Sequence, residues 1–228
     1  MTVARRVVLF AKPPLPGRAK TRLATELGPE AAARIAKALL LDTIALCEGL
    51  PGRFPEWDLR LVLAHDQGAE WFAPRLSAEW RMLAQCGASL DERLETALAD
   101  LAPATDDATI FLGMDSPQMP PQRVSQACAA LEGARAVLGP CADGGYYLLG
   151  VRGGLPAGTL AGVRWSTEHA LADTRAALER AGPVVAELAP GEDIDTPEDL
   201  RRLAAEIAAG TAPDLPNCRR VLLELGLL

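Results

Sequence analysis

The chain has 228 residues, of which 49% are hydrophobic and 23% are charged. This composition is typical of a globular protein with one substantial core and excludes a disordered or fibrous chain. The net charge of −7 at pH 7 argues against nucleic acid as a partner, because its binding needs an extended basic face. No apolar run approaches the roughly 20 residues of a membrane span, so we expect a cytoplasmic protein without a membrane-spanning segment.

Strand-length apolar runs alternate with segments of helical periodicity along the chain. The sequence predicts strands at 6–11, 59–64, 81–84, 108–113, 134–138, 146–151 and 184–188, and helices at 29–49, 67–76, 89–101, 120–132, 167–181 and 197–209. Strands joined by crossover helices form a parallel sheet that is covered on both faces. We therefore expect an α/β protein, a Rossmann-like α/β/α sandwich with a mostly parallel central sheet. Strand 146–151 follows no crossover helix and is the candidate for an antiparallel strand.

One domain is expected over residues 1–211, followed by a C-terminal linker and short helix over 212–228. Asn217 suits the N-cap of this last helix. Its apolar side chains are expected to pack either on the domain or on a second copy of the chain, which would form a homodimer.

A cationic loop follows the first strand. Six of the 23 Lys and Arg residues lie at or before Arg22, and the first acidic residue is Glu26. Prolines stiffen this loop and Gly17 permits a close approach, so several cations can be held near one anion. The loop is not a P-loop, because Pro14 and Ala19 stand where that motif requires glycine. We interpret it as a phosphate site; the alternative is an exposed loop with solvated charges.

Carboxylates follow two later segments, at strand ends where ligands of open α/β sheets collect. Asp115 comes just after strand 108–113 and suits Mg²⁺ held against phosphate oxygens, although an Asp-Ser-Pro turn also explains it. Thr196 begins a helix, which leaves Asp193 and Asp195 unexplained. In an extended segment these two carboxylates point to the same side.

A glycine pair follows strand 134–138. Gly144 and Gly145 allow backbone amides to reach a sugar or phosphate, and Asp143 can accept a hydrogen bond from a hydroxyl and is the candidate general base. A plain hairpin turn is the alternative. Further along, Ser166 or Thr167 is expected to cap the next helix.

The cysteines lack the paired spacing of zinc sites and redox dithiols. They are Cys47, Cys86, Cys128, Cys141 and Cys218. We expect reduced cysteines, mostly buried, and an oxygen-bound metal if one is present.

Together these motifs resemble an uncharacterised bacterial family, usually called glycosyltransferase A-like, within the nucleotide-diphospho-sugar transferase superfamily. The resemblance runs from about Val7 to Leu203 and rests on Lys20-Thr21-Arg22-Leu23, Gly113-Met114-Asp115-Ser116-Pro117, Asp143-Gly144-Gly145-Tyr146-Tyr147 and Asp193-Ile194-Asp195-Thr196-Pro197. The chain is also similar to phospholactate guanylyltransferases and molybdenum-cofactor nucleotidyltransferases.

The resemblance implies a glycosyltransferase A-type fold with a nucleotide across the carboxyl edge of the sheet. It also implies Mg²⁺ or Mn²⁺ between Asp115 and Asp195. We expect Lys20, Asp115 and Asp143 to be the catalytic residues. The nucleotide is expected to contact Ala11, Lys12, Pro13, Gly17, Arg18, Lys20, Arg22, Gln85, Gly87, Arg93, Gly144 and Gly145.

Three functions are compatible with these motifs. The first is a glycosyltransferase that moves a sugar from a nucleotide sugar to a small acceptor. The second is a nucleotidyltransferase that releases pyrophosphate from a nucleoside triphosphate. Both use Mg²⁺-assisted displacement of a phosphate leaving group. The third is a non-catalytic nucleotide-binding module.

Overall fold

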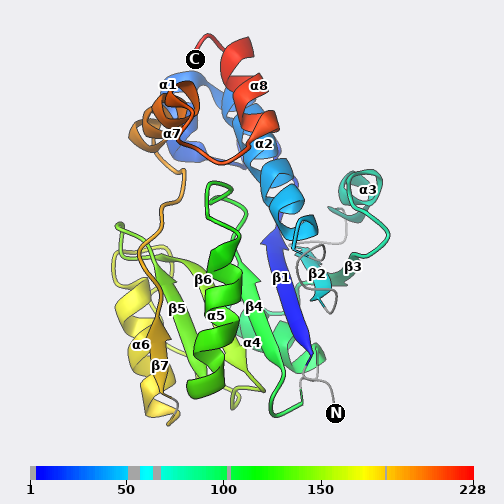
Figure 1. The fold of residues 1–228 in the computed structure, drawn as a ribbon, viewed down its shortest axis with the longest axis vertical. Helices are drawn as coiled ribbons and strands as arrows, with labels where there is room; N and C mark the ends of the chain where they lie inside the picture. The colour runs from blue at the N-terminus through cyan, green and yellow to red at the C-terminus, as the bar shows by residue number, and fades with distance from the viewer. Residues whose placement is uncertain (1–3, 51–56, 64–67, 102–103, 183) are drawn as a thin grey trace.

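A computed structural model describes residues 4–50, 57–63, 68–101, 104–182 and 184–228. Its centre is a sheet of seven strands in the order β3-β2-β1-β4-β6-β5-β7 (Figure 1). The strands are β1 (Arg5–Ala11), β2 (Trp57–Leu63), β3 (Arg81–Ala84), β4 (Ala108–Leu112), β5 (Ala136–Pro140), β6 (Tyr146–Arg152) and β7 (Val185–Glu187).

Strand β6 is the one antiparallel member of this sheet, pairing with β4 on one side and β5 on the other. Strands β1 to β4 are mutually parallel, and β5 is parallel to β7. The carboxyl ends of six strands and the amino end of β6 therefore share one edge, which we call the carboxyl edge. The mostly parallel α/β sheet expected from the sequence is confirmed.

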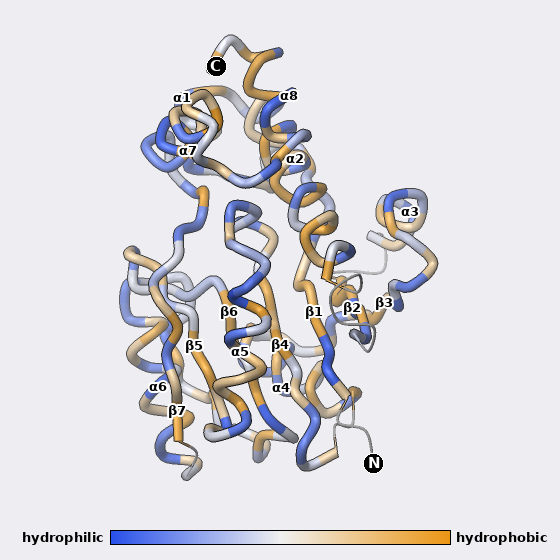
Figure 2. The backbone as a smooth tube through the Cα atoms, viewed as in Figure 1, coloured by the Kyte–Doolittle hydropathy of each residue, from blue (hydrophilic) through white to orange (hydrophobic). Residues whose placement is uncertain are grey.

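Helices cover both faces of the sheet. They are α1 (Thr21–Leu27), α2 (Pro29–Glu48), α3 (Ala69–Phe72), α4 (Leu90–Asp100), α5 (Gln122–Gly133), α6 (Ala170–Arg180), α7 (Pro197–Ala209) and α8 (Pro216–Glu224), with a 3₁₀ turn at Ala73–Arg75. On one face Val7 and Leu9 pack with α2 and α5, and on the other Val8 packs with α4 and α6. This alternation follows from the two-residue period of a strand, and Figure 2 shows the hydrophobic central strands that it produces.

A third apolar cluster, which we call the helical cluster, lies beyond the carboxyl edge, where α1, α7 and α8 pack against α2 (Figure 1). Leu23, Ile35, Leu39, Leu203 and Leu222 are buried in it. The cluster holds α1 and the chain before α7 above the sheet edge. No helix of the described part of the chain has the length and apolar character that crossing a membrane requires.

Several local expectations need correction. The sequence did not predict α1, and the expected helix 67–76 is a short α3 followed by the 3₁₀ turn, with Gln67 outside the described residues. Asn217 does not cap α8, which begins one residue earlier; instead its backbone and side-chain N–H groups donate to Asp42 Oδ1 at 3.1 and 2.8 Å. Helix α6 begins after His169, so neither Ser166 nor Thr167 is its cap.

Candidate active site at the carboxyl edge

A compact turn carries the chain from β1 to α1. The backbone N–H groups of Arg18 and Ala19 both donate to Leu15 O, and Gly17 adopts a φ of 73° that favours glycine. Lys20 follows at the N-cap position of α1, with a φ of 48°. The turn therefore delivers Lys20 to the end of β1 in a conformation that non-glycine residues rarely adopt.

The ammonium group of Lys20 lies between two carboxylates. Its Nζ is 2.6 Å from Asp115 Oδ1 and 2.6 Å from Asp195 Oδ1, and its side chain is only 4% exposed. Burial by itself would lower the pKa of Lys20, but the two carboxylates outweigh this and raise the pKa above its usual value. Lys20 is therefore a buried cation at neutral pH.

A backbone contact brings Asp115 and Asp195 together. The N–H of Ile194 donates to Asp115 O at 3.0 Å, and the Ile194 side chain is buried in the helical cluster. A capping box then fixes the start of α7, with Thr196 Oγ1 accepting from the Asp199 N–H and the Asp199 carboxylate accepting from the Thr196 N–H. The expected helix start and the expected proximity of the two aspartates both occur.

A cleft of about 450 Å³ opens above Lys20. We call it the cationic cleft; it is lined by Lys12, Arg18, Ala19, Lys20, Thr21, Arg22, Ala36, Met114, Asp115, Ser166 and Asp195. Its four cations face two carboxylates. Among the described residues, Lys20 and Ser166 are the non-glycine residues with positive φ, and both line this cleft. Such conformations concentrate at functional sites.

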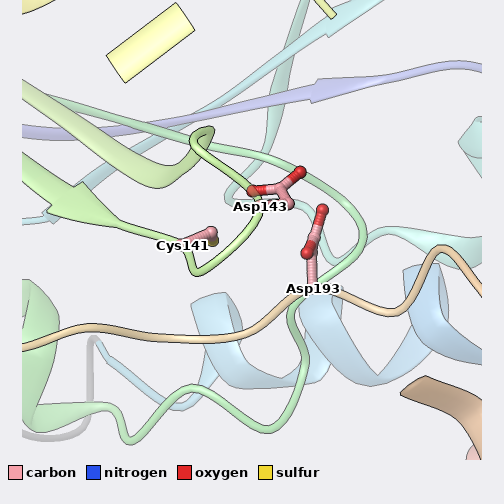
Figure 3. Close-up of side chains that lie close together, drawn as sticks. All are labelled: Cys141, Asp143 and Asp193. Atoms are coloured by element: carbon pink, nitrogen blue, oxygen red, sulfur yellow. The ribbon is translucent and has the colours of Figure 1, made fainter. Parts of the chain in front are cut away.

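A pair of carboxyl groups lies beside this cleft. Cys141 forms a parallel bridge with Gly191, so two residues further on Asp143 and Asp193 are neighbours, and their carboxyl groups face one another in Figure 3. One ligand atom from each of Cys141, Asp143 and Asp193 lies within 4.8 Å of the others. Burial, together with the charges of Asp143 and Asp195, raises the pKa of Asp193 to about 6.

A second cleft, of about 540 Å³, adjoins the first. We call it the aromatic cleft; its lining includes Phe10, Leu90, Leu94, Phe111, Tyr146, Tyr147 and Trp165, with Asp143, Glu168, Asp193, Asp195, Arg22 and Ser166 among its polar members. Arg22, Ser166 and Asp195 line both clefts. The two clefts therefore meet at these three residues.

The structure gathers part of the expected site. The cations Lys12, Arg18, Lys20 and Arg22 line the cationic cleft, and Asp143 and Gly145 line the aromatic cleft. Gly144 lines neither cleft. A Cβ atom at this position would come within 2.1 Å of Glu168 O, so a close backbone contact explains this glycine.

Other expected nucleotide contacts lie outside both clefts. Ala11, Pro13 and Gly17 belong to the β1 end and the turn but line neither cleft. After β3, Gln85 donates to Val62 O, and the Arg93 guanidinium donates to Gly87 O and Ala88 O. These bonds hold the turn before α4, and a nucleotide role for Gln85, Gly87 and Arg93 stays a prediction.

Three features of the site were not assigned from the sequence. No function was assigned to Asp193 from the sequence, although its spacing from Asp195 predicted that both carboxylates lie on the same side of an extended segment. The aromatic cleft was not expected, because its residues come from seven separate segments. Ser166 was read as a helix cap, and the sequence carries no signal of its positive φ.

The donor set fits a hard divalent cation. Asp115 Oδ1 and Asp195 Oδ1 converge on one point, at present the Lys20 ammonium, and Asp143 and Asp193 add further carboxylate oxygens nearby. Cys141 does not belong to such a set, because burial and the neighbouring carboxylates raise the pKa of its thiol to about 12 and keep it protonated. The fit is therefore to Mg²⁺ or Mn²⁺ held by aspartates.

This fold, with polar residues gathered at the carboxyl edge, is that of the nucleotide-diphospho-sugar transferases and related nucleotidyltransferases. Across 98% of this chain and 97% of the other, the protein resembles a candidate nucleotide-diphospho-sugar transferase from Desulfovibrio desulfuricans G20, with 28% identity and a TM-score of 0.85. The chain belongs to the family described as "Uncharacterized protein conserved in bacteria (DUF2064)", whose model matches residues 52–167. The resemblance expected from the motifs is confirmed.

More distant structures share the fold alone. The 4-diphosphocytidyl-2C-methyl-D-erythritol synthase of Anaerococcus prevotii DSM 20548 matches with 12% identity over 90% of this chain and 99% of its own, at a TM-score of 0.55. A CMP:2-keto-3-deoxy-manno-octonic acid synthetase in complex with CTP matches with 12% identity over 91% of this chain and 99% of its own, at a TM-score of 0.52. No curated protein matches the sequence.

Proposed function

We propose that the protein is a Mg²⁺- or Mn²⁺-dependent glycosyltransferase that moves a sugar from a nucleotide sugar to a small acceptor. The observation that carries this proposal is the cationic cleft, in which buried Lys20 sits between Asp115 and Asp195 at the end of β1. A cleft with several fixed cations and two convergent carboxylates is suited to a metal-bound diphosphate. The name of the 28% identical relative supports the same class of donor.

Each charged residue has a role in this proposal. Arg18, Lys20 and Arg22 bind the phosphates and stabilise the negative charge that builds up on the leaving group. Asp115 and Asp195 hold the divalent cation, which when bound supplies further neutralisation of the diphosphate. Asp143, exposed at the mouth of the aromatic cleft, accepts the proton of the acceptor hydroxyl.

Lys20 and the divalent cation would share the same two carboxylate oxygens. A nucleotide phosphate that attracts the ammonium would free these oxygens for the metal. We therefore expect nucleotide and metal to bind cooperatively.

Nucleotidyl transfer is the second candidate, and the number of cations favours it. Lys12, Arg18, Lys20 and Arg22 together line the cationic cleft, and a triphosphate needs more neutralisation than a diphosphate. In that reaction the acceptor attacks the α-phosphorus and pyrophosphate leaves.

A thermal-stability screen distinguishes the two candidates. With Mg²⁺ present, the midpoint of unfolding is measured against nucleoside triphosphates, nucleoside diphosphates and nucleotide sugars, because selective binding raises stability with ligand excess. A larger shift for one nucleotide sugar supports glycosyl transfer and identifies the donor. A larger shift for a triphosphate favours nucleotidyl transfer, and turnover with any acceptor would exclude a purely binding module.

A further inference from the structure

We propose that the aromatic cleft binds the acceptor, and that this acceptor carries no negative charge and has an apolar ring or chain bearing a nucleophilic hydroxyl. The inference rests on the proposed function, since it assigns the second substrate of the same site.

The two clefts differ in the sign of their charge. The cationic cleft has Lys12, Arg18, Lys20 and Arg22 against two carboxylates. The aromatic cleft has four carboxylates, Asp143, Glu168, Asp193 and Asp195, against Arg22 alone. Phosphates are therefore attracted to the first cleft, whereas a phosphorylated or carboxylated acceptor would meet like charges in the second.

Two aromatic pairs build the wall of the second cleft. The rings of Phe10 and Phe111 meet edge to face with centroids 5.7 Å apart, and those of Tyr146 and Trp165 meet in the same way at 6.5 Å. Trp165 is anchored, because its indole N–H donates to Asp91 Oδ1 at 3.3 Å. Such a preformed aromatic surface suits an apolar ring or chain and loses little entropy on binding.

Leu90 extends this apolar surface to the mouth of the cleft, where 36% of the residue remains exposed. A cleft of about 540 Å³ is within the range of small-molecule sites. The apolar lining and the acidic rim together specify an amphipathic molecule without negative charge.

The shared residues place the acceptor next to the donor. Because Arg22, Ser166 and Asp195 line both clefts, an acceptor in the aromatic cleft can present its hydroxyl to a sugar whose diphosphate lies in the cationic cleft. The hydroxyl oxygen forms a bond to the anomeric carbon as the bond from that carbon to the phosphate oxygen breaks. The nucleoside diphosphate leaves with the electron pair, and Asp143 takes the hydroxyl proton.

Three matched probes test this inference by saturation-transfer NMR, with the protein held in Mg²⁺ and saturating nucleoside diphosphate. Phenyl β-D-glucopyranoside is neutral with an apolar ring, its 6-phosphate is the anionic counterpart, and methyl β-D-glucopyranoside lacks the ring. We expect millimolar binding of the phenyl glucoside, and binding about tenfold weaker for each of the other two.

Variants assign the binding to the cleft. Trp165→Ala and Leu90→Ser, a change at a partly exposed position, should each weaken phenyl glucoside binding, the first about tenfold. Trp71→Ala, outside both clefts, is the matched control. Glu168→Lys should strengthen binding of the 6-phosphate several-fold, whereas Glu179→Lys on the exposed face of α6 should not.

Opposite outcomes would overturn the inference. The first is that the 6-phosphate binds as tightly as the neutral phenyl glucoside, or more tightly. The second is that the phenyl glucoside does not bind, and the third is that neither Trp165→Ala nor Leu90→Ser changes its binding. Loss of nucleotide affinity in Trp165→Ala without any acceptor would instead assign the cleft to the nucleobase. In each case, if nucleotide with Mg²⁺ still raises the unfolding temperature of the wild-type protein, the proposed function is not contradicted. If nucleotide with Mg²⁺ does not raise that temperature, the proposed function itself is contradicted.

Discussion

Aspartates at the two edges of the sheet lie in opposite environments. At the amino edge Asp107 is buried and accepts from the Ala4 N–H at 2.9 Å, the Ala104 N–H at 2.9 Å and Arg6 Nη1 at 3.0 Å. At the carboxyl edge, Asp115 and Asp195 both contact buried Lys20, and Arg22 lies 4.0 Å from Asp195. Asp143 and Asp193 lie close to one another beside Asp195, in the lining of the aromatic cleft.

The pKa values reflect this difference. Burial acts to raise the pKa of Asp107, but its hydrogen bonds and Arg6 outweigh burial and lower it below the ordinary 3.8. Burial and neighbouring carboxylates raise the pKa of Asp193 to about 6. A carboxylate that accepts several hydrogen bonds, such as Asp107, stabilises the fold. Carboxylates that lie close together with few hydrogen-bond donors, such as Asp193 and its neighbours, indicate a site where a ligand supplies the missing partners.

The largest effect is expected at the amino edge. Asp107→Ala leaves two backbone N–H groups without their acceptor and removes one of the two carboxylates that pair with Arg6, so we expect a loss of about 3 kcal/mol in the free energy of unfolding. Denaturant titration measures it. Asp106→Ala, which changes the exposed neighbour, is the control, and equal stability of the two variants would contradict a structural role for Asp107.

A smaller effect of opposite sense is expected for metal binding at the carboxyl edge. Lys20→Met removes the cation that competes for Asp115 and Asp195, so affinity for Mn²⁺ without nucleotide should rise about tenfold, or about 1.4 kcal/mol. Calorimetric titration with Mn²⁺ measures this. The control is Lys37→Met on the exposed side of α2, and weaker Mn²⁺ binding in Lys20→Met would show that Lys20 does not compete with the metal.

The smallest effect concerns pH. Because the folded pKa of Asp193 is raised to about 6, its ionisation disfavours the fold, and stability is lost as pH rises from about 4 to 7. Partial exposure keeps this below about 1 kcal/mol. For Asp107 the free energy of unfolding changes with pH in the opposite direction, since its stabilisation is present above pH 3.8 and is lost as pH falls below that value.

Thermal unfolding across this pH range, with chelator present, tests the difference. Asp193→Asn should gain stability relative to the wild type as pH rises toward 7. An identical pH profile for the two proteins would contradict the crowding of carboxylates at this edge.

The sequence predicted most of the sheet and the long helices, because their periodicity is local. Helix α2 was expected from apolar residues at helical spacing, and β3 was expected at its observed bounds. Helix α1 was missed because seven residues are too few to establish a helical period. The approach of Asp115 and Asp195 was implied by the family resemblance and agrees with the rule that ligands collect at this edge.

The remaining features depend on tertiary contacts that no local pattern encodes. Asp143 and Asp193 are neighbours through the bridge between Cys141 and Gly191, which joins segments 50 residues apart in the printed sequence. The aromatic cleft needs α4, α6 and three strands in their folded positions. Lys20 was expected to face phosphate, and its pairing with both aspartates follows from the turn that ends in its left-handed conformation.

Isothermal calorimetry with a nucleoside diphosphate, with and without Mg²⁺, tests the central claim most directly. We predict Mg²⁺-dependent binding by the wild type and by Lys37→Ala, and at least about 100-fold weaker binding, or about 2.7 kcal/mol, in both Lys20→Ala and Asp115→Ala with folding retained. Unchanged affinity in both Lys20→Ala and Asp115→Ala would contradict the assignment of the carboxyl edge as a metal-dependent nucleotide site.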